Sequence, residues 1–308
     1  MEIQDMNHEE KELKIKEILE AFKMFDGKYK REEIDAAIEL KEDITPHLIK
    51  ILENVLADPN QYIENDDLFD QMYAVMLLGY LKEPKAHKVI VELFSLPTDL
   101  PHQLFGDTTT EDFPRILVNT CGGSIDQIKA LILNRDADDF CRSSASRALN
   151  DAVVIGYTSR EETLDFYKNL FTEDDAEDSS AFLGMLANSV CNLYPIEIMD
   201  IIKQAYENEL IDTMSINLSD FEDELKLGKE KCLEKLTKDF EARSLNDLHK
   251  SMSWWACFKE KPKAPSTTVS PSASLSAPAP KKSQQNKKPQ SKKKKKQAKA
   301  SKKKNRRK

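Results

Sequence analysis

Pairs of amphipathic helices that recur every 35 to 40 residues are the feature that most constrains this fold. The second helix of each pair is expected to begin near Pro46, Pro84, Ser124, Ser159 and Pro195, at intervals of 38, 40, 35 and 36 residues. A period of this length is typical of stacked helical hairpins, each of which needs neighbours to bury its apolar face. The sequence therefore predicts an all-α, HEAT-like array of helical hairpins, an α-solenoid.

The residue pattern within the pairs favours helices over strands. Met72–Tyr80 is a nearly continuous apolar run, and the apolar residues after Pro84 recur at helical spacing. Glycine is scarce, with 8 residues in 308, and Glu, Lys, Leu and Ala are abundant, which also favours helix. Leu77 and Leu131 lie on apolar stripes and are expected in the core.

The two ends of the array are expected to differ from the repeats. Glu9–Phe25 predicts an N-terminal capping helix, and Leu218–Glu241 predicts one long, charged helix near the C-terminal end. Trp254 and Trp255 follow this helix. They are interpreted either as a hydrophobic lid on the last repeat or as an aromatic docking point for a partner.

Charge is divided unevenly along the chain. Residues 259–308 hold 17 lysines, two arginines and one glutamate, a net charge of +18, whereas the other residues hold 27 bases and 53 acids, a net of −26. A segment with so little apolar surface cannot offset its ordering entropy. We therefore expect a HEAT-like helical repeat domain over 1–258, which folds by itself, and a disordered Pro/Ser/Ala then Lys-rich tail over 259–308.

The basic tail is predicted to bind polyanions, namely nucleic acid or the ribosome, because clustered lysine and arginine neutralise phosphates. Alternatively, the tail binds an acidic protein, or it binds the acidic body of this chain. A further hypothesis is a secreted bacterial effector, directed to a host nucleus by these basic runs. The residues predicted to bind polyanions are Lys292, Lys293, Lys294, Lys295, Lys296, Lys302, Lys303, Lys304, Arg306, Arg307 and Lys308.

Residue types that carry catalysis or hold metals are scattered along the sequence. The five histidines lie far apart, and the five cysteines have no paired spacing, so four of the cysteines are expected in the core. We therefore expect no enzyme, no cofactor and no metal. Neither a secretion signal nor an apolar stretch of membrane-spanning length is found, which predicts a cytoplasmic protein. The repeat array together with the uneven charge predicts a scaffold that binds a protein partner.

Gly106–Asp112 is the most unusual polar segment of the body. Thr108 and Glu111 have the spacing of a capping box, which predicts the start of a helix. The alternative is a partner-binding loop, because loops on a rigid scaffold commonly carry function. The candidate partner-binding residues are Asp107, Glu111, Trp254 and Trp255.

Cys121–Ser124 contains the only Gly-Gly pair and is expected to join two helices, with Ser124 as the helix N-cap. An alternative is a reactive thiol at Cys121. This alternative belongs to a less favoured enzyme hypothesis, in which a site lies within residues 106–124.

Several short segments resemble an uncharacterised bacterial family, a domain of unknown function with HEAT-like helices. They are Phe25–Tyr29, Ile44–Leu48, Gly106–Asp107 with Thr110–Leu117, Cys121–Gly123 and Trp254–Trp255. The resemblance covers about residues 15 to 258 and implies a helical-repeat fold and a bacterial origin, but no reaction. Members are often followed by a SEC-C zinc motif. That motif is absent here, and the basic tail takes its place.

Overall fold

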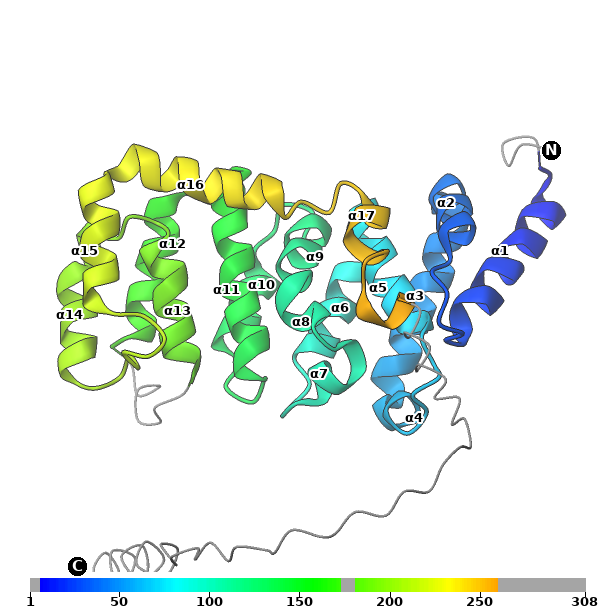
Figure 1. The fold of residues 1–308 in the computed structure, drawn as a ribbon, viewed down its shortest axis with the longest axis horizontal. Coiled ribbons are helices and arrows are strands. Elements are labelled where there is room, and N and C mark those ends of the chain that lie inside the picture. The colour runs from blue at the N-terminus through cyan, green and yellow to red at the C-terminus, as the bar shows by residue number, and fades with distance from the viewer. Residues whose placement is uncertain (1–5, 173–180, 260–308) are drawn as a thin grey trace, which may run out of the picture. The chain divides into compact units, whose positions relative to one another are not determined.

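The computed structural model describes residues 6–172 and 181–259, and every regular element in these ranges is a helix (Figure 1). The predicted all-α repeat array is confirmed. The elements, in chain order, are α1 (His8–Lys23), α2 (Arg31–Glu39), α3 (Lys41–Ala57), α4 (Pro59–Ile63), α5 (Asp70–Leu81), η2 (Pro84–Ala86), α6 (His87–Phe94), α7 (Leu100–Phe105), α8 (Thr108–Glu111), α9 (Phe113–Thr120), α10 (Asp126–Leu133), α11 (Asp139–Val154), α12 (Arg160–Leu170), α13 (Ala181–Cys191), η4 (Ile196–Ile198), α14 (Met199–Glu207), α15 (Leu218–Leu227), α16 (Lys229–Ala242), α17 (Leu248–Met252) and η5 (Ala256–Phe258).

Successive hairpins stack in the order of the sequence within the helical unit. The first helices of the pairs, α5, α9, α11 and α13, each contact the next, while the second helices α3, α6 and α10 contact one another on the other side. Each hairpin therefore buries its apolar face against its neighbours, as the repeat period predicts. Among the described residues, no helix combines the length and apolar character needed to cross a membrane.

Helix boundaries follow local capping chemistry at some expected positions and depart from it at others. Ser159 caps α12 in a capping box with Glu162, as its position predicts. The start expected near Pro46 is wrong, because Pro46 lies inside α3, which begins five residues earlier. The helix expected near Ser124 begins at Asp126, but its N-cap is Ile125 and not Ser124.

The core contains the residues that periodicity assigned to it. Leu77 and Leu131 are buried, and so are four of the five cysteines, with Cys257 exposed. Gly79 permits a close approach between α5 and α9, because a Cβ atom at this position would lie 2.7 Å from Ile116 Cγ1.

The long helix expected over Leu218–Glu241 is interrupted. Gly228 adopts φ 90° and ψ 152°, which ends α15 and lets α16 leave in a new direction. Helix α16 then runs back along the row of hairpins and contacts α11, and α17 beyond it contacts α5 (Figure 1). We call residues 229–259 the strap.

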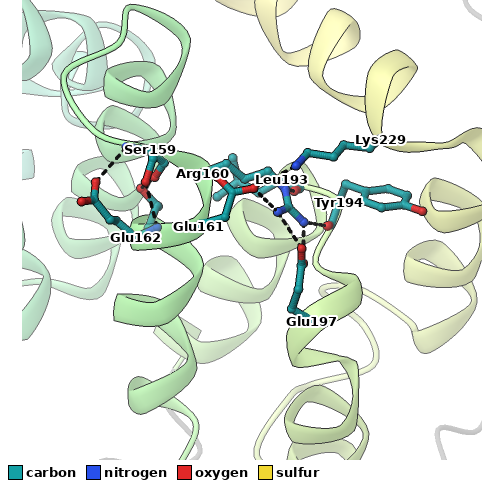
Figure 2. A network of polar contacts seen from close by, with 9 residues as sticks. Ser159, Arg160, Glu161, Glu162, Leu193, Tyr194, Glu197 and Lys229 are labelled. Atoms are coloured by element: carbon teal, nitrogen blue, oxygen red, sulfur yellow. Dashed lines mark hydrogen bonds and ion pairs between the residues drawn. The ribbon is translucent and has the colours of Figure 1, made fainter.

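An arginine network fastens the beginning of the strap (Figure 2). Arg160, at the start of α12, donates to the backbone oxygens of Leu193 and Tyr194 and forms an ion pair with Glu197. Its neighbour Glu161 accepts from Lys229, the first residue of α16, at 2.8 Å. The strap is thus tied to the last hairpins of the row where it begins.

The end of the strap is fastened to the first helices of the chain. The Phe258 ring lies within an aromatic cluster, with ring centroids 5.3 Å from Tyr29 and 5.9 Å from Phe69. His249 Nδ1 lies 2.8 Å from the Tyr29 hydroxyl, and its Nε2 lies 2.7 Å from an oxygen of the Asp35 carboxylate. The expected lid on the last repeat is therefore wrong, because this segment packs against the first helices.

The predicted polyanion-binding residues 292–308 lie outside the described residues, as does the rest of the tail beyond Lys259. The predicted boundary at residue 258, with a disordered tail after it, therefore stays a prediction. The helical unit described above belongs to Met1–Glu260.

Candidate binding groove

A groove of 1370 Å³ lies between the strap and the middle of the helical row. One wall is formed by α8 with the end of α7, and the floor by the beginning of α5 and the loop before it. The opposite wall is the strap from the end of α16 to Cys257. We call this feature the strap groove.

The α8 wall is held from behind by α11. Ser144 Oγ donates to the backbone oxygen of Thr109 at 2.7 Å, and Arg147 Nη1 donates to that of Thr110 at 2.7 Å. Thr108 and Thr109 are buried, whereas Asp107 and Glu111 are exposed. The backbone of this segment is therefore fixed while its two carboxylates are exposed, although Glu111 also lies within electrostatic reach of the Arg147 guanidinium.

The strap wall presents aromatic and polar side chains. Asp247 caps α17 by accepting from the backbone N–H of Lys250 at 2.9 Å. Trp254 is 61% exposed, and Trp255 is half-buried and stacked on Phe258, with ring centroids 6.0 Å apart. An exposed indole of this size beside a groove is typical of interface anchors.

The structure brings together the four residues that the sequence proposed for partner binding. Asp107 and Glu111 lie on the α8 wall, and Trp254 and Trp255 on the strap wall. Their role in binding stays a prediction. The capping box expected at Thr108 does not form, since Asp107 precedes the one-turn helix α8 without a side-chain cap.

The groove also contains residues that the sequence did not single out. Gln71 in the floor is 5% exposed; its Nε2 donates to the backbone oxygen of Leu104 at 3.3 Å, and its Oε1 has no hydrogen-bond partner among the described residues. Asp112 is the last residue of the polar segment Gly106–Asp112, but it was not among the candidate partner-binding residues. The others come from α4, α5 and α7, from loops and from the strap, whose return along the row leaves no local pattern in the sequence.

Asp112 has an unusual environment for a carboxyl group. Burial raises the pKa of Asp112 from 3.8 to about 6, and the neighbouring Glu111 adds to the rise. Asp112 also precedes α9 without capping it through its side chain. At neutral pH the protein therefore holds a poorly solvated negative charge in the groove, which costs stability unless a cation is bound.

We expect Asp112→Asn to stabilise the protein by about 1–2 kcal/mol at pH 7.5. The substitution removes the free-energy cost that corresponds to the raised pKa of Asp112, but it also removes a favourable negative charge from the start of α9. The folded-state pKa exceeds the unfolded one, so stability falls as pH rises from about 4 to 6. The gain should accordingly be absent near pH 4. Urea unfolding at both pH values measures it, with exposed Asp223→Asn as the control; a gain of equal size at both values would contradict the assignment.

The alternative of a reactive thiol finds no support in the geometry of Cys121. Cys121 is 7% exposed, and burial raises the pKa of its thiol. Within residues 6–172 and 181–259, no three His, Cys, Asp or Glu side chains are placed to share a metal ion. The groove as described presents carboxylates, amides and indoles.

Comparison with known proteins identifies the family. Residues 13–259 match the family described as "Protein of unknown function (DUF1186)". The chain belongs to this family. The DUF1186 match includes every residue of the strap groove and stops where the basic tail is expected to begin.

Two proteins from Chlamydia are similar to this chain. An uncharacterized protein of Chlamydia trachomatis is 31% identical over 244 residues, which are 79% of this chain and 96% of the relative. One of Chlamydia muridarum is 32% identical over 210 residues, which are 68% of this chain and 84% of the relative. No solved structure matches the chain.

Proposed function

We propose that the protein is a non-enzymatic, cytoplasmic interaction scaffold that holds a segment of a partner protein in the strap groove. The observation that carries this proposal is the convergence of Asp107, Glu111, Trp254 and Trp255 on one groove from distant parts of the chain. The volume of 1370 Å³ exceeds the range of about 300–1,000 Å³ that is usual for small-molecule pockets, which favours a peptide segment.

The basic tail has a separate part in this proposal. Its net charge of +18 supports electrostatic attachment to nucleic acid or the ribosome, while the acidic helical unit disfavours such binding elsewhere. The affinity of the tail for a polyanion should fall steeply as the salt concentration rises, because it depends on phosphate contacts. The affinity of a peptide held in the groove should change less, because its contacts are shielded from solvent.

The enzyme hypothesis for residues 106–124 is favoured by one observation, the raised pKa of Asp112, since perturbed carboxyl groups in grooves are common in active sites. The two functions respond differently to Asp112→Asn. A scaffold retains a bound partner with altered affinity, whereas an acid–base enzyme loses turnover by orders of magnitude.

Site-directed crosslinking tests the scaffold proposal. A photo-crosslinking residue in place of Trp254 should capture a discrete partner in cells, and the same residue in place of Met214, which is 93% exposed elsewhere, should not. We expect Trp254→Ala to lower the affinity of the captured partner at least tenfold, the usual effect of losing an indole anchor. Equal capture at both positions, or an unchanged affinity, would count against the groove as the binding site.

A further inference from the structure

The walls of the strap groove carry an excess of negative charge. Six carboxylates line it, against two basic side chains, Arg243 and Lys250. Arg243 is already engaged, because its Nε lies 3.1 Å from Asp239. The six carboxylates belong to Asp66, Asp107, Glu111, Asp112, Glu241 and Asp247.

Several of these carboxylates lack partners of their own. The side chains of Asp66 and Asp107 make no hydrogen bond or ion pair with the rest of the described residues, and Asp112 has only like charge beside it. Exposed acids elsewhere on the helices are often paired, as in Lys88–Glu92 and Lys226–Asp223. The charge of the groove is therefore left for an occupant to neutralise.

Trp254, which lines the groove together with these carboxylates, indicates which chemical groups an occupant would carry. An ammonium or guanidinium group over an indole face gains cation–π energy, and the surrounding carboxylates add charge-assisted hydrogen bonds. A phosphate or an acidic peptide meets repulsion from the same side chains. The exposed Trp254 and the half-buried Trp255 also offer apolar surface to a neighbouring side chain of the occupant.

We propose that the strap groove recognises a basic peptide segment of a partner protein, with at least two lysine or arginine side chains and an apolar residue near them. This inference rests on the proposed function and names the partner's chemistry. The source is another protein and not this chain's own tail, because the family match includes the whole groove and stops at residue 259. In the Chlamydia trachomatis relative the match covers 96% of the protein, which leaves little room for a comparable tail.

A random octapeptide library displayed on phage and selected on the full-length protein tests the proposal. Enrichment of lysine and arginine at two or more positions is expected. The best selected peptide, labelled for fluorescence anisotropy, should bind at least tenfold more weakly to the variant Asp107→Asn/Glu111→Gln. The matched variant Glu222→Gln/Asp223→Asn removes the same charge from α15 and should bind normally.

Each other outcome has a distinct meaning. Enrichment of acidic or uncharged peptides that still depend on Trp254 would refute the basic segment but retain the groove as a binding site. Peptides insensitive to Trp254→Ala would refute the groove, and with it the proposed function. Binding more than tenfold tighter to a chain that ends after Lys259, once its helicity and cooperative melting are verified, would identify the tail as the occupant and overturn the choice of a partner.

Discussion

Asp151→Ala is expected to lower the free energy of unfolding by about 3–5 kcal/mol, because it leaves a buried guanidinium without its carboxylate. Asp151 on α11 forms an ion pair with Arg115 on α9, and both side chains are 5% exposed. Arg115 also lies over the Phe240 ring at 4.8 Å and donates to the backbone oxygen of Asp239 at 3.5 Å. The pair therefore joins two hairpins of the row and supports α16 above them.

Thermal and urea unfolding measure this effect, which corresponds to a fall in melting temperature of about 6–20 °C for a domain of this size. The double variant Arg115→Met/Asp151→Leu should be more stable than the single variant, since apolar residues can replace a buried pair with little loss. Asp223→Ala is the control, because its pair with Lys226 is exposed and such pairs contribute about 0–1 kcal/mol. A loss below about 1 kcal/mol in Asp151→Ala would show that the buried pair is not formed.

Phe258→Ala should release the end of the strap and destroy the groove with it. Complete burial makes a Phe-to-Ala change cost about 3–5 kcal/mol, and the half-buried Phe258 should cost about 2–3 kcal/mol. Its ring contacts the rings of Phe25, Tyr29 and Phe69, which lie in loops between the first helices, and the ring of Tyr73 on α5. Within the strap, the His249 ring also lies edge-on against Tyr29, the same aromatic neighbour that Phe258 contacts.

Hydrogen exchange locates this effect. Backbone amides of residues 244–258 should exchange at least tenfold faster in Phe258→Ala, while those of α11 stay protected, because α11 is held by its own neighbours. Binding of a groove ligand should be lost in the same variant. Trp254→Ala is the matched control, since it should weaken binding and leave exchange of the strap unchanged. Uniformly faster exchange across α11 as well would mean that Phe258 stabilises the whole array and not the strap.

The helical row was predictable because its signals are local and repeated. Apolar spacing identified the buried faces that contain Leu77 and Leu131, and the repeat interval placed the start of a helix near Ser159, which caps α12. Where a local signal has competing explanations, the prediction failed. The repeat interval predicts a helix start near Pro46, but α3 begins at Lys41 and extends through Pro46, because burial of Ile44 and Leu48 on either side stabilises the longer helix.

The sequence predicted two of the segments that line the groove, but not that they lie close together. The polarity of Gly106–Asp112 and the adjacent tryptophans Trp254 and Trp255 are visible in the sequence, so both segments were candidates for binding a partner. Their proximity is not visible, because they are separated by more than 140 residues of intervening helices. Buried polar side chains such as Gln71 and Arg115 also escape local reading, since their partners come from other hairpins.

By itself the sequence determined the all-α class, the stacking of hairpins in chain order and the residues of their core. These follow from periodicity, which acts between residues a few turns apart. Only the tertiary structure decided that the chain breaks at Gly228 and returns along the row to reach Tyr29 and Asp35. That return depends on contacts such as Tyr29–His249, 220 residues apart, whose pairing leaves no periodic trace because each partner is selected by shape and hydrogen bonding in the assembled fold.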